Sequence, residues 1–454
     1  MTAPVRALFG SLRAAIVLTA VLALAPAFAH AASYILSTAP GTPIAPLAAK
    51  YQFVVEKSSA TSSGILYSIA TATPLTATAL HNLTVEPGVR NVESNCTVDS
   101  SEAEPGSQAR QSLQSLGNLL STRATVPYYG SAVLSTYVTQ PGTQMIELSA
   151  AQAAFGSGSG TVAIIDTGVD LEHPALRGAL VPGYDFTRNR PDTVSELLDL
   201  SAPVAAALQQ STVELLDSKQ YIVALQQSTV EILDQSTVEL LDGQGLPSAF
   251  GHGTMVAGLV HLVAPGAKIM PLKAFHADGS ASIFDIAAAI TYAVDHGAGV
   301  ISMSFAYTTP SPTLEAAIAY AKSHGVLCVA SAGNDGAKTY MYPADYPNVV
   351  GVGSVNFADR RSPFSNYGPA ARTSAPGEAL VTIFPGGNYA AVWGTSFSSA
   401  LVAGGVIVMR TLRPHLQYDD LQDVLETGVP IDQGMGDARF DLLRSLRYLL
   451  THGG

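Results

Sequence analysis

The stretch Val162-Ala163-Ile164-Ile165-Asp166-Thr167-Gly168 decides how this chain folds. Its four apolar residues form a short continuous run, which predicts a buried strand, and Asp166 closes that strand. Strands that are apolar on both faces are typical of parallel sheets covered by helices. In such open α/β sheets, functional groups gather beyond the carboxyl ends of the strands. We therefore predict that Asp166 lies in a functional site.

Similar apolar runs recur further along the chain. They lie at 268–272, 299–303 and 326–330, and alternate with alanine-rich helical stretches at 282–296 and 313–324. Continuous apolar strands that alternate with helices predict an α/β domain with a mostly parallel central sheet and helices on both faces. We place this domain at 145–454.

The composition excludes two classes of protein. The chain has 454 residues, of which 47% are apolar and 13% charged. This is enough material for a sizeable core and excludes disorder along the whole chain. With 23 Lys and Arg against 35 Asp and Glu, the net charge is −12, so we expect no nucleic-acid partner. Two cysteines, Cys96 and Cys328, are too few for a disulfide framework.

The N-terminus has the layout of a secretory signal peptide. Arg6 and Arg13 precede the apolar run 14–25, and a small-residue pattern follows it, either Ala27-Phe28-Ala29 or Ala29-His30-Ala31. The run is too short to cross a bilayer core, which takes about 20 residues. We predict a signal peptide at 1–31, no stable membrane span after its removal, and a secreted or periplasmic mature chain.

The segment after the signal peptide is predicted to be a small α+β domain at 32–98. Its strands and helices follow a βαββαβ order, at 34–36, 44–51, 53–55, 65–70, 76–85 and 89–93. Residues 99–144 mix Ser, Gln, Pro and Gly without a sustained period, which predicts a linker or exposed junction.

Three further polar residues stand at positions suited to chemistry. His252 lies between two glycines, which leaves its imidazole uncovered at the start of a helix. Ser396 precedes the apolar run 401–409, so its hydroxyl would lie beside unpaired N–H groups of a first helical turn. Asn334 follows the strand at 326–330 and offers an amide donor to a developing oxyanion. Taken singly, each is also typical of a structural role: a packed histidine, an N-cap serine and a turn asparagine.

Two other hydrolase types share part of this pattern. An aspartic protease also contains Asp-Thr-Gly, but it needs two carboxylates that share a proton. No second Asp-Thr-Gly or Asp-Ser-Gly exists in this chain. An α/β-hydrolase order of Ser396, Asp432 and His452 is available, but its nucleophile turn requires glycine where Ser398 stands.

Four motifs together resemble the subtilisin-like serine proteases, the subtilase family. They are I-D-T-G at 165–168, G-H-G-T at 251–254, A-G-N at 332–334 and G-T-S at 394–396, in that order. The resemblance spans about 145–432 and implies a subtilisin-like fold with serine endopeptidase activity. It implies that Ser396 attacks the scissile carbonyl and that His252, oriented by Asp166, takes and returns the proton. Asn334 and the backbone N–H of Ser396 would then hold the oxyanion.

The resemblance also implies where a substrate binds. The segment V-I-S-M-S at 300–304 is similar to the substrate-binding strand of the family. We expect Ser302, Ser304 and Phe305 to pair with the substrate backbone by β-addition. The small residues expected to form the floor of the side-chain pocket are Ala330, Ser331, Ala332 and Gly333. Their size predicts a preference for large apolar substrate side chains.

The domain at 32–98, with P-G-V-R-N-V-E at 87–93, is similar to the inhibitory propeptide that often precedes such enzymes. The resemblance therefore implies a zymogen whose partners are protein or peptide substrates and its own propeptide. Many subtilases bind calcium, but no Asp-x-Asp-x-Asp-Gly loop is present here. We expect no required cofactor; calcium binding stays an open alternative, and no residues are assigned to it. The alternative function is a catalytically idle subtilase-like binding or adhesion module, and retention of all four polar groups argues against it.

A repeat-containing acidic insertion lies at 190–248, between Asp166 and His252. The sequence Q-S-T-V-E-[L/I]-L-D occurs at 210–217, 227–234 and 235–242. Each repeat has serine three residues before glutamate, which predicts a capped short helix. The insertion is predicted to be either a tolerated low-complexity loop or an acidic flap beside the cleft. Since the insertion contains no reacting group, we expect excision of 192–246 to leave hydrolysis of small peptides nearly intact and to change the turnover of folded protein substrates.

Overall fold

The computed structural model describes residues 32–61, 64–99, 123–191, 193–206, 208, 223–224, 230–232, 246–431 and 434–452. The predicted signal peptide at 1–31 lies outside these residues. The first and third repeats, at 210–217 and 235–242, also lie outside them.

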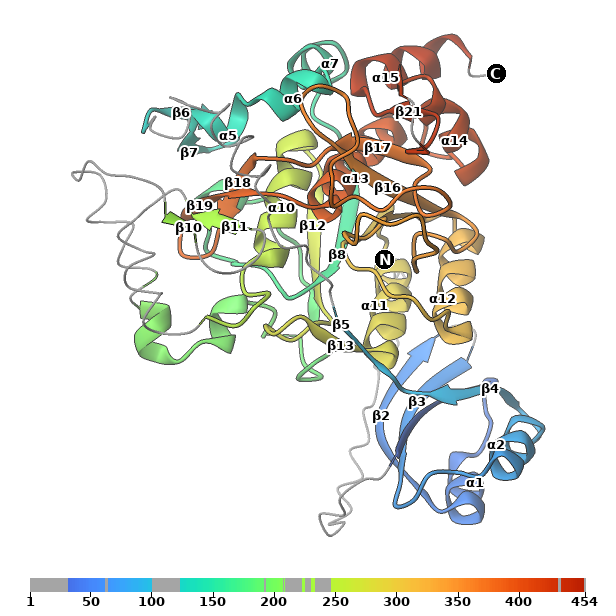
Figure 1. Cartoon of the computed structure of the whole chain (residues 1–454). Coiled ribbons are helices and arrows are strands. Elements are labelled where there is room, and N and C mark those ends of the chain that lie inside the picture. Colours follow the sequence, from blue (N-terminus) through green and yellow to red (C-terminus); the bar gives the residue numbers. More distant parts are fainter. Residues whose placement is uncertain are drawn as a thin grey trace, which may run out of the picture.

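A nine-stranded sheet forms the centre of the main domain (Figure 1). The strands lie in the order β20-β21-β17-β16-β15-β14-β8-β12-β9, and all neighbours are parallel except β20 and β21. Their bounds are β8 Thr161–Asp166, β9 Tyr184–Asp185, β12 Lys268–Lys273, β14 Val300–Met303, β15 Leu327–Ser331, β16 Val349–Val355, β17 Thr373–Pro376, β20 Val429–Pro430 and β21 Ala438–Arg439. The chain runs from β8 to β12 on one side and then crosses to β14 on the other. The strand order therefore reverses beside β8, which is where open α/β sheets place their sites. The predicted fold class is confirmed.

Side chains of β8 alternate between two hydrophobic clusters. Val162 and Ile164 belong to the cluster that contains α10 and α13, whereas Ala163 and Ile165 belong to the cluster that contains α11 and α12. Because successive side chains of a strand point to opposite faces, these clusters are the two covered faces of the sheet. The helices are α10 His252–Val263, α11 Ile283–Asp295, α12 Pro312–Ser323 and α13 Thr395–Leu412.

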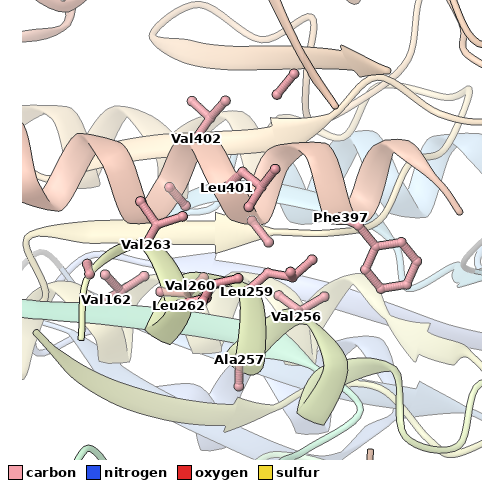
Figure 2. Close-up of a cluster of buried hydrophobic side chains, with 14 of the residues drawn as sticks. Val162, Val256, Ala257, Leu259, Val260, Leu262, Val263, Phe397, Leu401 and Val402 are labelled. Carbon is pink, nitrogen blue, oxygen red and sulfur yellow. The ribbon is translucent and has the colours of Figure 1, made fainter. Parts of the chain in front are cut away.

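Helices α10 and α13 pack directly against each other. Figure 2 shows Val256 and Val260 of α10 lying beneath Phe397 and Leu401 of α13. By length and composition α13 could span a membrane, but 83% of it is buried inside the fold. It is the core helix of this domain, and its first turn contains Ser396.

The N-terminal residues form a separate small sheet with its own core. The elements are β1 Ala32–Thr38, α1 Ile44–Tyr51, β2 Phe53–Thr61, β3 Gly64–Thr71, α2 Ala77–Thr84 and β4 Val89–Ser94, in the βαββαβ order that the sequence predicts. The four strands are antiparallel, in the order β2-β3-β1-β4. Tyr34 and Leu36 of β1 face the helices α1 and α2, whereas Ile35 packs into the cluster of α11 and α12. The unit therefore rests on α11 and α12 with one face of its sheet (Figure 1).

Part of the predicted linker at 99–144 belongs to the main domain. Its elements are β6 Thr125–Tyr128, β7 Ser131–Leu134, α5 Ser135–Val138 and α6 Pro141–Met145, followed by α7 Leu148–Phe155. The Tyr137 hydroxyl donates to the carbonyl oxygen of Gly258 at 2.6 Å. The Gln140 side chain bonds both the N–H and the C=O of Val381 at 2.8 Å. The linker prediction is wrong here because these short elements are stabilised by distant partners, which no local period reveals.

The acidic insertion is also partly built into the domain. It contributes the 3-10 helix η2, Glu196–Asp199, and the strands β10 Val223–Ala224 and β11 Val230–Ile232. With β18 Leu380–Phe384 and β19 Asn388–Val392, these strands form a second sheet in the order β10-β11-β19-β18. Strand β11 comes from the second repeat, where we predicted a helix. That prediction is wrong because Val230–Ile232 pairs with the edge of β19. The remaining elements are β5 Thr97–Asp99, η1 Pro174–Leu176, β13 Ser280–Ser282, α14 Tyr418–Glu426 and α15 Leu442–Thr451.

His261 of α10 is a buried titratable group behind β6. Its ring lies 5.5 Å from that of Tyr128 and 6.4 Å from that of Tyr129. Within the described part of the chain neither ring nitrogen has a hydrogen-bond partner. Burial lowers the pKa of His261 from 6.5 to about 4. The folded state therefore favours the neutral ring, and its stabilisation is lost as the pH falls below 6.5 towards 4.

We expect His261→Phe to reduce the acid sensitivity of the fold. Each pKa unit corresponds to about 1.4 kcal/mol, so the native histidine should cost about 2 to 3 kcal/mol of unfolding free energy between pH 7 and pH 4.5. Denaturant unfolding at both pH values, in a Ser396→Ala background, measures this loss. The variant should lose less than the parent, and the exposed His324→Phe control should behave like the parent. Equal losses in all three proteins would contradict the assignment to His261.

Candidate active site

Asp166 occupies the carboxyl end of β8, at the point where the strand order reverses. Its side chain is only 4% exposed. The backbone N–H of Thr167 donates to Asp166 Oδ1 at 2.7 Å, and this fixes one face of the carboxylate. A buried carboxylate of this kind needs hydrogen-bond donors around it to offset its desolvation.

His252 is the first residue of α10 and lies against Asp166. Its Nδ1 is 2.8 Å from Asp166 Oδ1 and 3.0 Å from Oδ2. Gly251, with φ of 89°, turns the chain into the helix in the left-handed region that favours glycine. With Nδ1–H donating to the carboxylate, the neutral ring has its basic lone pair on Nε2. Asp166 therefore sets both the orientation and the tautomer of His252.

Ser396 lies in the first turn of α13, on the opposite side of β8 from β12. The Ser396 hydroxyl donates to the carbonyl oxygen of Ser304 at 3.2 Å. The ring of the next residue, Phe397, has its centroid 5.6 Å from that of His252, which places the start of α13 beside the start of α10. Three segments far apart in the sequence thus bring Asp166, His252 and Ser396 together at the carboxyl ends of the parallel strands.

Asn334 follows β15 at the same edge. Its Oδ1 accepts hydrogen bonds from the N–H and the hydroxyl of Thr395, both at 2.9 Å. Since Thr395 precedes Ser396, these bonds tie the amide group of Asn334 to the first turn of α13. They also fix Oδ1 as the acceptor side, so the NH₂ group is the side that can donate to a third group.

Of the three residues predicted to pair with a substrate, Ser302 lies inside a strand, whereas Ser304 and Phe305 lie beyond its end. Ser302 belongs to β14, whose backbone pairs with β8 on one side and β15 on the other. An interior strand has no free edge, so the prediction that Ser302 pairs with a substrate is wrong. Ser304 and Phe305 follow the end of β14. Phe305 is buried against Phe275, with ring centroids 4.9 Å apart.

The predicted pocket-floor residues lie behind the sheet edge. Ala330 and Ser331 belong to β15, and Ala332 and Gly333 follow it, all of them buried. The Ser331 hydroxyl donates to the carbonyl oxygen of Phe305 at 3.3 Å. The segment therefore contacts Phe305 directly, and its role in holding a substrate side chain stays a prediction.

An added strand is present at a different place, which the sequence did not reveal. Strand β5 (Thr97–Asp99) pairs antiparallel with β13 (Ser280–Ser282), with Val98 opposite Ala281. The N–H of Ile283 also donates to the carbonyl oxygen of Cys96 at 3.2 Å. The sequence Ser-Ala-Ser is only three residues long and contains no large apolar side chain, so its pattern is too weak to predict a strand. This edge accepts an extended peptide and is the strongest candidate for backbone recognition.

A second group that the sequence did not reveal is Glu196, at the start of η2. Its carboxylate is fully buried beside two threonines. Thr167 directly follows Asp166, and Thr254 lies two residues after His252. We expect excision of 192–246 to leave hydrolysis of small peptides nearly intact because the insertion contains no reacting group. Its first residues nevertheless belong to the site, because Glu196 contacts the segments that hold Asp166 and His252. The effect of the excision on hydrolysis stays a prediction.

The model that describes the subtilase family matches residues 158–441. The thermophilic serine proteinase of Bacillus sp. (strain AK1) is 35% identical over 249 residues, which are 55% of this chain and 51% of that protein. Subtilisin BL of Lederbergia lenta is 38% identical over 173 residues, 36% of this chain and 64% of that protein. Thermitase of Thermoactinomyces vulgaris is 32% identical over 289 residues, 61% of this chain and 82% of that protein.

The matched segment spans about half of the first of these relatives and under two thirds of the second. Among solved structures, the crystal structure of fervidolysin from Fervidobacterium pennivorans, a keratinolytic enzyme related to subtilisin, has a TM-score of 0.66. It covers 92% of this chain, 61% of the fervidolysin chain is covered in return, and the two are 22% identical. At that identity the likeness concerns the fold.

Gly253 is the residue of α10 that lies closest to the end of β8, and its lack of a side chain matters for stability. A Cβ at Gly253 would lie 2.0 Å from the carbonyl oxygen of Gly168 and 3.1 Å from Asp166 Cβ. Since backbone cannot yield as a flexible side chain does, Gly253→Ala should lower the unfolding free energy by about 1 to 3 kcal/mol or more. Gly299→Ala is the control, because its nearest contact is the side-chain end of Ile407 at 3.1 Å. Equal denaturation midpoints for the two variants would contradict the close approach.

Proposed function

This chain belongs to the subtilase family, and from that premise we propose that it is a serine endopeptidase. Hydrolysis would pass through an acyl-enzyme intermediate on Ser396. The observation that carries the proposal is the hydrogen bond from His252 Nδ1 to Asp166, at the sheet edge where α13 presents Ser396. A histidine oriented in this way is the general base that an unactivated serine hydroxyl needs.

The proposed reaction uses these groups in sequence. Ser396 Oγ attacks the scissile carbonyl carbon while its proton passes to His252 Nε2, and Asp166 stabilises the imidazolium that forms. The C–N bond then breaks as His252 gives the proton to the leaving amine. Water, deprotonated by the same nitrogen, hydrolyses the ester and restores the Ser396 hydroxyl. A protonated His252 cannot act as a base, so hydrolysis should decline on acidification.

Asn334 would stabilise the oxyanion of each tetrahedral intermediate. Its oxygen is already engaged by Thr395, which leaves the NH₂ group as the donor, and the backbone N–H of Ser396 would be the second donor. Such preorganised donors act without reorganisation at the moment of reaction. The same retention of four polar groups speaks against an idle binding or adhesion module.

The N-terminal unit at 32–98 is proposed to be an inhibitory propeptide. Glu93 accepts a hydrogen bond from the Ser311 hydroxyl at 2.7 Å and from the Thr313 N–H at 3.3 Å, at the start of α12. Asn95 Oδ1 accepts from the N–H of Phe284, at the start of α11, at 3.2 Å. These contacts satisfy helix N–H groups that would otherwise lack partners. Because β5 follows directly, the unit would deliver its own chain to the edge of β13.

An ion pair adds to this contact. Lys57 of β2 lies 2.8 Å and 2.9 Å from the two carboxylate oxygens of Asp285 in α11, and it also donates to the carbonyl oxygen of Phe186. Burial raises the pKa of Asp285, and Lys57 opposes that rise.

The layout of residues 1–31 supports the further proposal that the chain is exported and acts outside the cytoplasm. The substrates proposed are proteins or peptides; no cofactor is required by the groups named here.

The catalytic assignment predicts three linked results. A fluorophosphonate probe should label the wild-type chain and leave Ser396→Ala unlabelled, because the probe reacts with an activated serine hydroxyl. Asn334→Leu should lower kcat by about 10²- to 10³-fold with little change in KM, since it removes one oxyanion donor. Ser398→Ala is the matched control, because this serine lies in the same helical turn and bonds the carbonyls of Ala375 and Pro376. Labelling of Ser396→Ala, or full turnover by it, would overturn the assignment.

The propeptide proposal predicts inhibition in trans. A fragment of residues 32–99 should inhibit the processed enzyme at micromolar concentration, and circular dichroism checks that the fragment is folded. Glu93→Gln and Asn95→Ala in the fragment should weaken inhibition, because each removes a contact to a helix start. Glu86→Gln is the control, since its partners Lys50 and Tyr51 belong to the fragment itself. A folded fragment that does not inhibit would contradict the proposal.

A further inference from the structure

The first residues of the acidic insertion lie against the turn that follows Asp166. The N–H of Val169 donates to the carbonyl oxygen of Val194 at 3.0 Å, which holds this segment against the turn that follows β8. At Gly168, with φ of 113°, an added Cβ would lie 2.4 Å from the same oxygen and 3.2 Å from Glu196 Cγ. Only glycine therefore allows Glu196 to approach the end of β8 so closely.

The carboxylate of Glu196 is surrounded by four donors. Its Oε1 accepts from the Thr167 hydroxyl and from the N–H of Gly253 at 3.3 Å. Its Oε2 accepts from the hydroxyl of Thr254 and from the N–H of the same residue at 3.3 Å. The two N–H groups belong to the first turn of α10, where an anion is favoured by the helix dipole. Glu196 is thus bound to the turn that contains His252.

Thr167 links Glu196 to Asp166. The Thr167 hydroxyl accepts from the N–H of Gly253 at 3.0 Å and lies 3.2 Å from Asp166 Oδ1. It has one proton, which cannot be donated to Glu196 and Asp166 together. When Glu196 is ionised, the Thr167 hydroxyl donates its hydrogen bond to the Glu196 carboxylate. When Glu196 is protonated, its own O–H can donate to the Thr167 oxygen. The Thr167 hydroxyl can then donate to Asp166 instead.

We propose that Glu196 is a positioning residue for the Asp166–His252 pair, a role that rests on the proposed peptidase function. The ionised carboxylate fixes the Thr167 hydroxyl and the first turn of α10 in one arrangement. This arrangement keeps Asp166 Oδ1 available to His252 Nδ1, at 2.8 Å. Glu196 reaches the reacting atoms only through Thr167 and α10.

Burial is the main reason why Glu196 changes its protonation state near neutral pH. It raises the pKa of Glu196 to about 7, although the hydrogen bonds from Thr167 and Thr254 lower that pKa; among the nearby charges, Asp166 acts to raise it and Lys273 to lower it. Asp170 contacts this cluster through its backbone N–H, which donates to the Thr254 hydroxyl at 2.8 Å, while its carboxylate accepts from the N–H groups of Glu172 and Gly386. Glu196 is therefore ionised above about pH 7 and becomes protonated below it. The catalytic pair should lose its support over the same interval.

The segment that contains Glu196 has a second, independent anchor. Buried Lys273 donates to Asp199 Oδ2 at 2.8 Å and to the carbonyl oxygens of Thr167 and Phe275. Arg188 bonds both Asp199 and Asp185. These bonds do not involve Glu196, so a change of its charge leaves the segment attached. Glu196→Gln therefore tests positioning separately from folding.

The experiment compares Glu196→Gln with wild type and with Glu172→Gln, which alters an exposed glutamate near the same turn. We expect Glu196→Gln to lower kcat about 10- to 100-fold with KM changed less than twofold, as displacement of a catalytic group does. In wild type, the acid side of the kcat/KM profile should depend on two protons, from His252 and Glu196. In Glu196→Gln it should depend on one.

Thr167 variants provide the second measurement. Thr167→Val removes the hydroxyl that connects the two carboxylates and should reproduce the loss of kcat, whereas Thr167→Ser should restore it. Combining Thr167→Val with Glu196→Gln should cost no more than either change alone. Unchanged kcat and an unchanged two-proton profile in a folded Glu196→Gln would overturn the role of Glu196. A wild-type chain that hydrolyses no peptide would instead overturn the proposed function, and this role with it.

Discussion

The close approach of α10 to the end of β8, seen in the hydrogen bond between Asp166 and His252, is the constraint on which the geometry of the site depends. To form this hydrogen bond, the start of α10 must reach the end of β8 closely enough for Nδ1 and Oδ1 to lie 2.8 Å apart. That distance requires glycine at 253 and a carboxylate at the carboxyl end of β8. It also requires a core in which α10 and α13 pack side by side (Figure 2). The packing of α13 on α10 then determines where Ser396 lies. The hydrophobic core and the polar site are thus consequences of the same helix placement.

The features that sequence predicts are those with a local cause. The run Val162–Ile165 is apolar on both faces because it separates two hydrophobic clusters, so its continuous pattern is sufficient to predict a buried parallel strand. Asp166 follows at the carboxyl end, where general topology places sites. The βαββαβ order of the N-terminal unit was also predicted, because short apolar stretches separated by turns mark its elements. The length of β2 was not, since its residues after Val55 are mostly polar and it continues to Thr61.

The features that sequence did not predict depend on distant partners. Residues 125–145 have no period of their own, yet Tyr137 and Gln140 bond Gly258 and Val381. Strand β13 has three small residues and becomes a strand only because β5 pairs with it. Ser302 was misplaced for the related reason that a short run does not reveal whether a strand lies at an edge or in the interior. In each case tertiary contacts determine the role of a segment whose local signal is weak.

Glu196 illustrates how far the same residues depend on their surroundings. The tetrapeptide E-L-L-D at 196–199 also occurs at 214–217 and 239–242, and E-I-L-D occurs at 231–234. In the 3-10 helix η2, side chains three residues apart share one face, so Glu196 and Asp199 both turn inward while Leu198 is exposed. In β11 the backbone at Glu231 is extended and pairs with Ala391 of β19. The first two residues of the tetrapeptide, Glu-Leu or Glu-Ile, thus lie in a 3-10 turn at 196 and in a strand at 231. At 196 the segment is held by the carbonyl of Val194, which accepts from Val169, and by Lys273, which bonds Asp199. The proposed role of Glu196 is therefore a property of these tertiary contacts and not of the tetrapeptide itself.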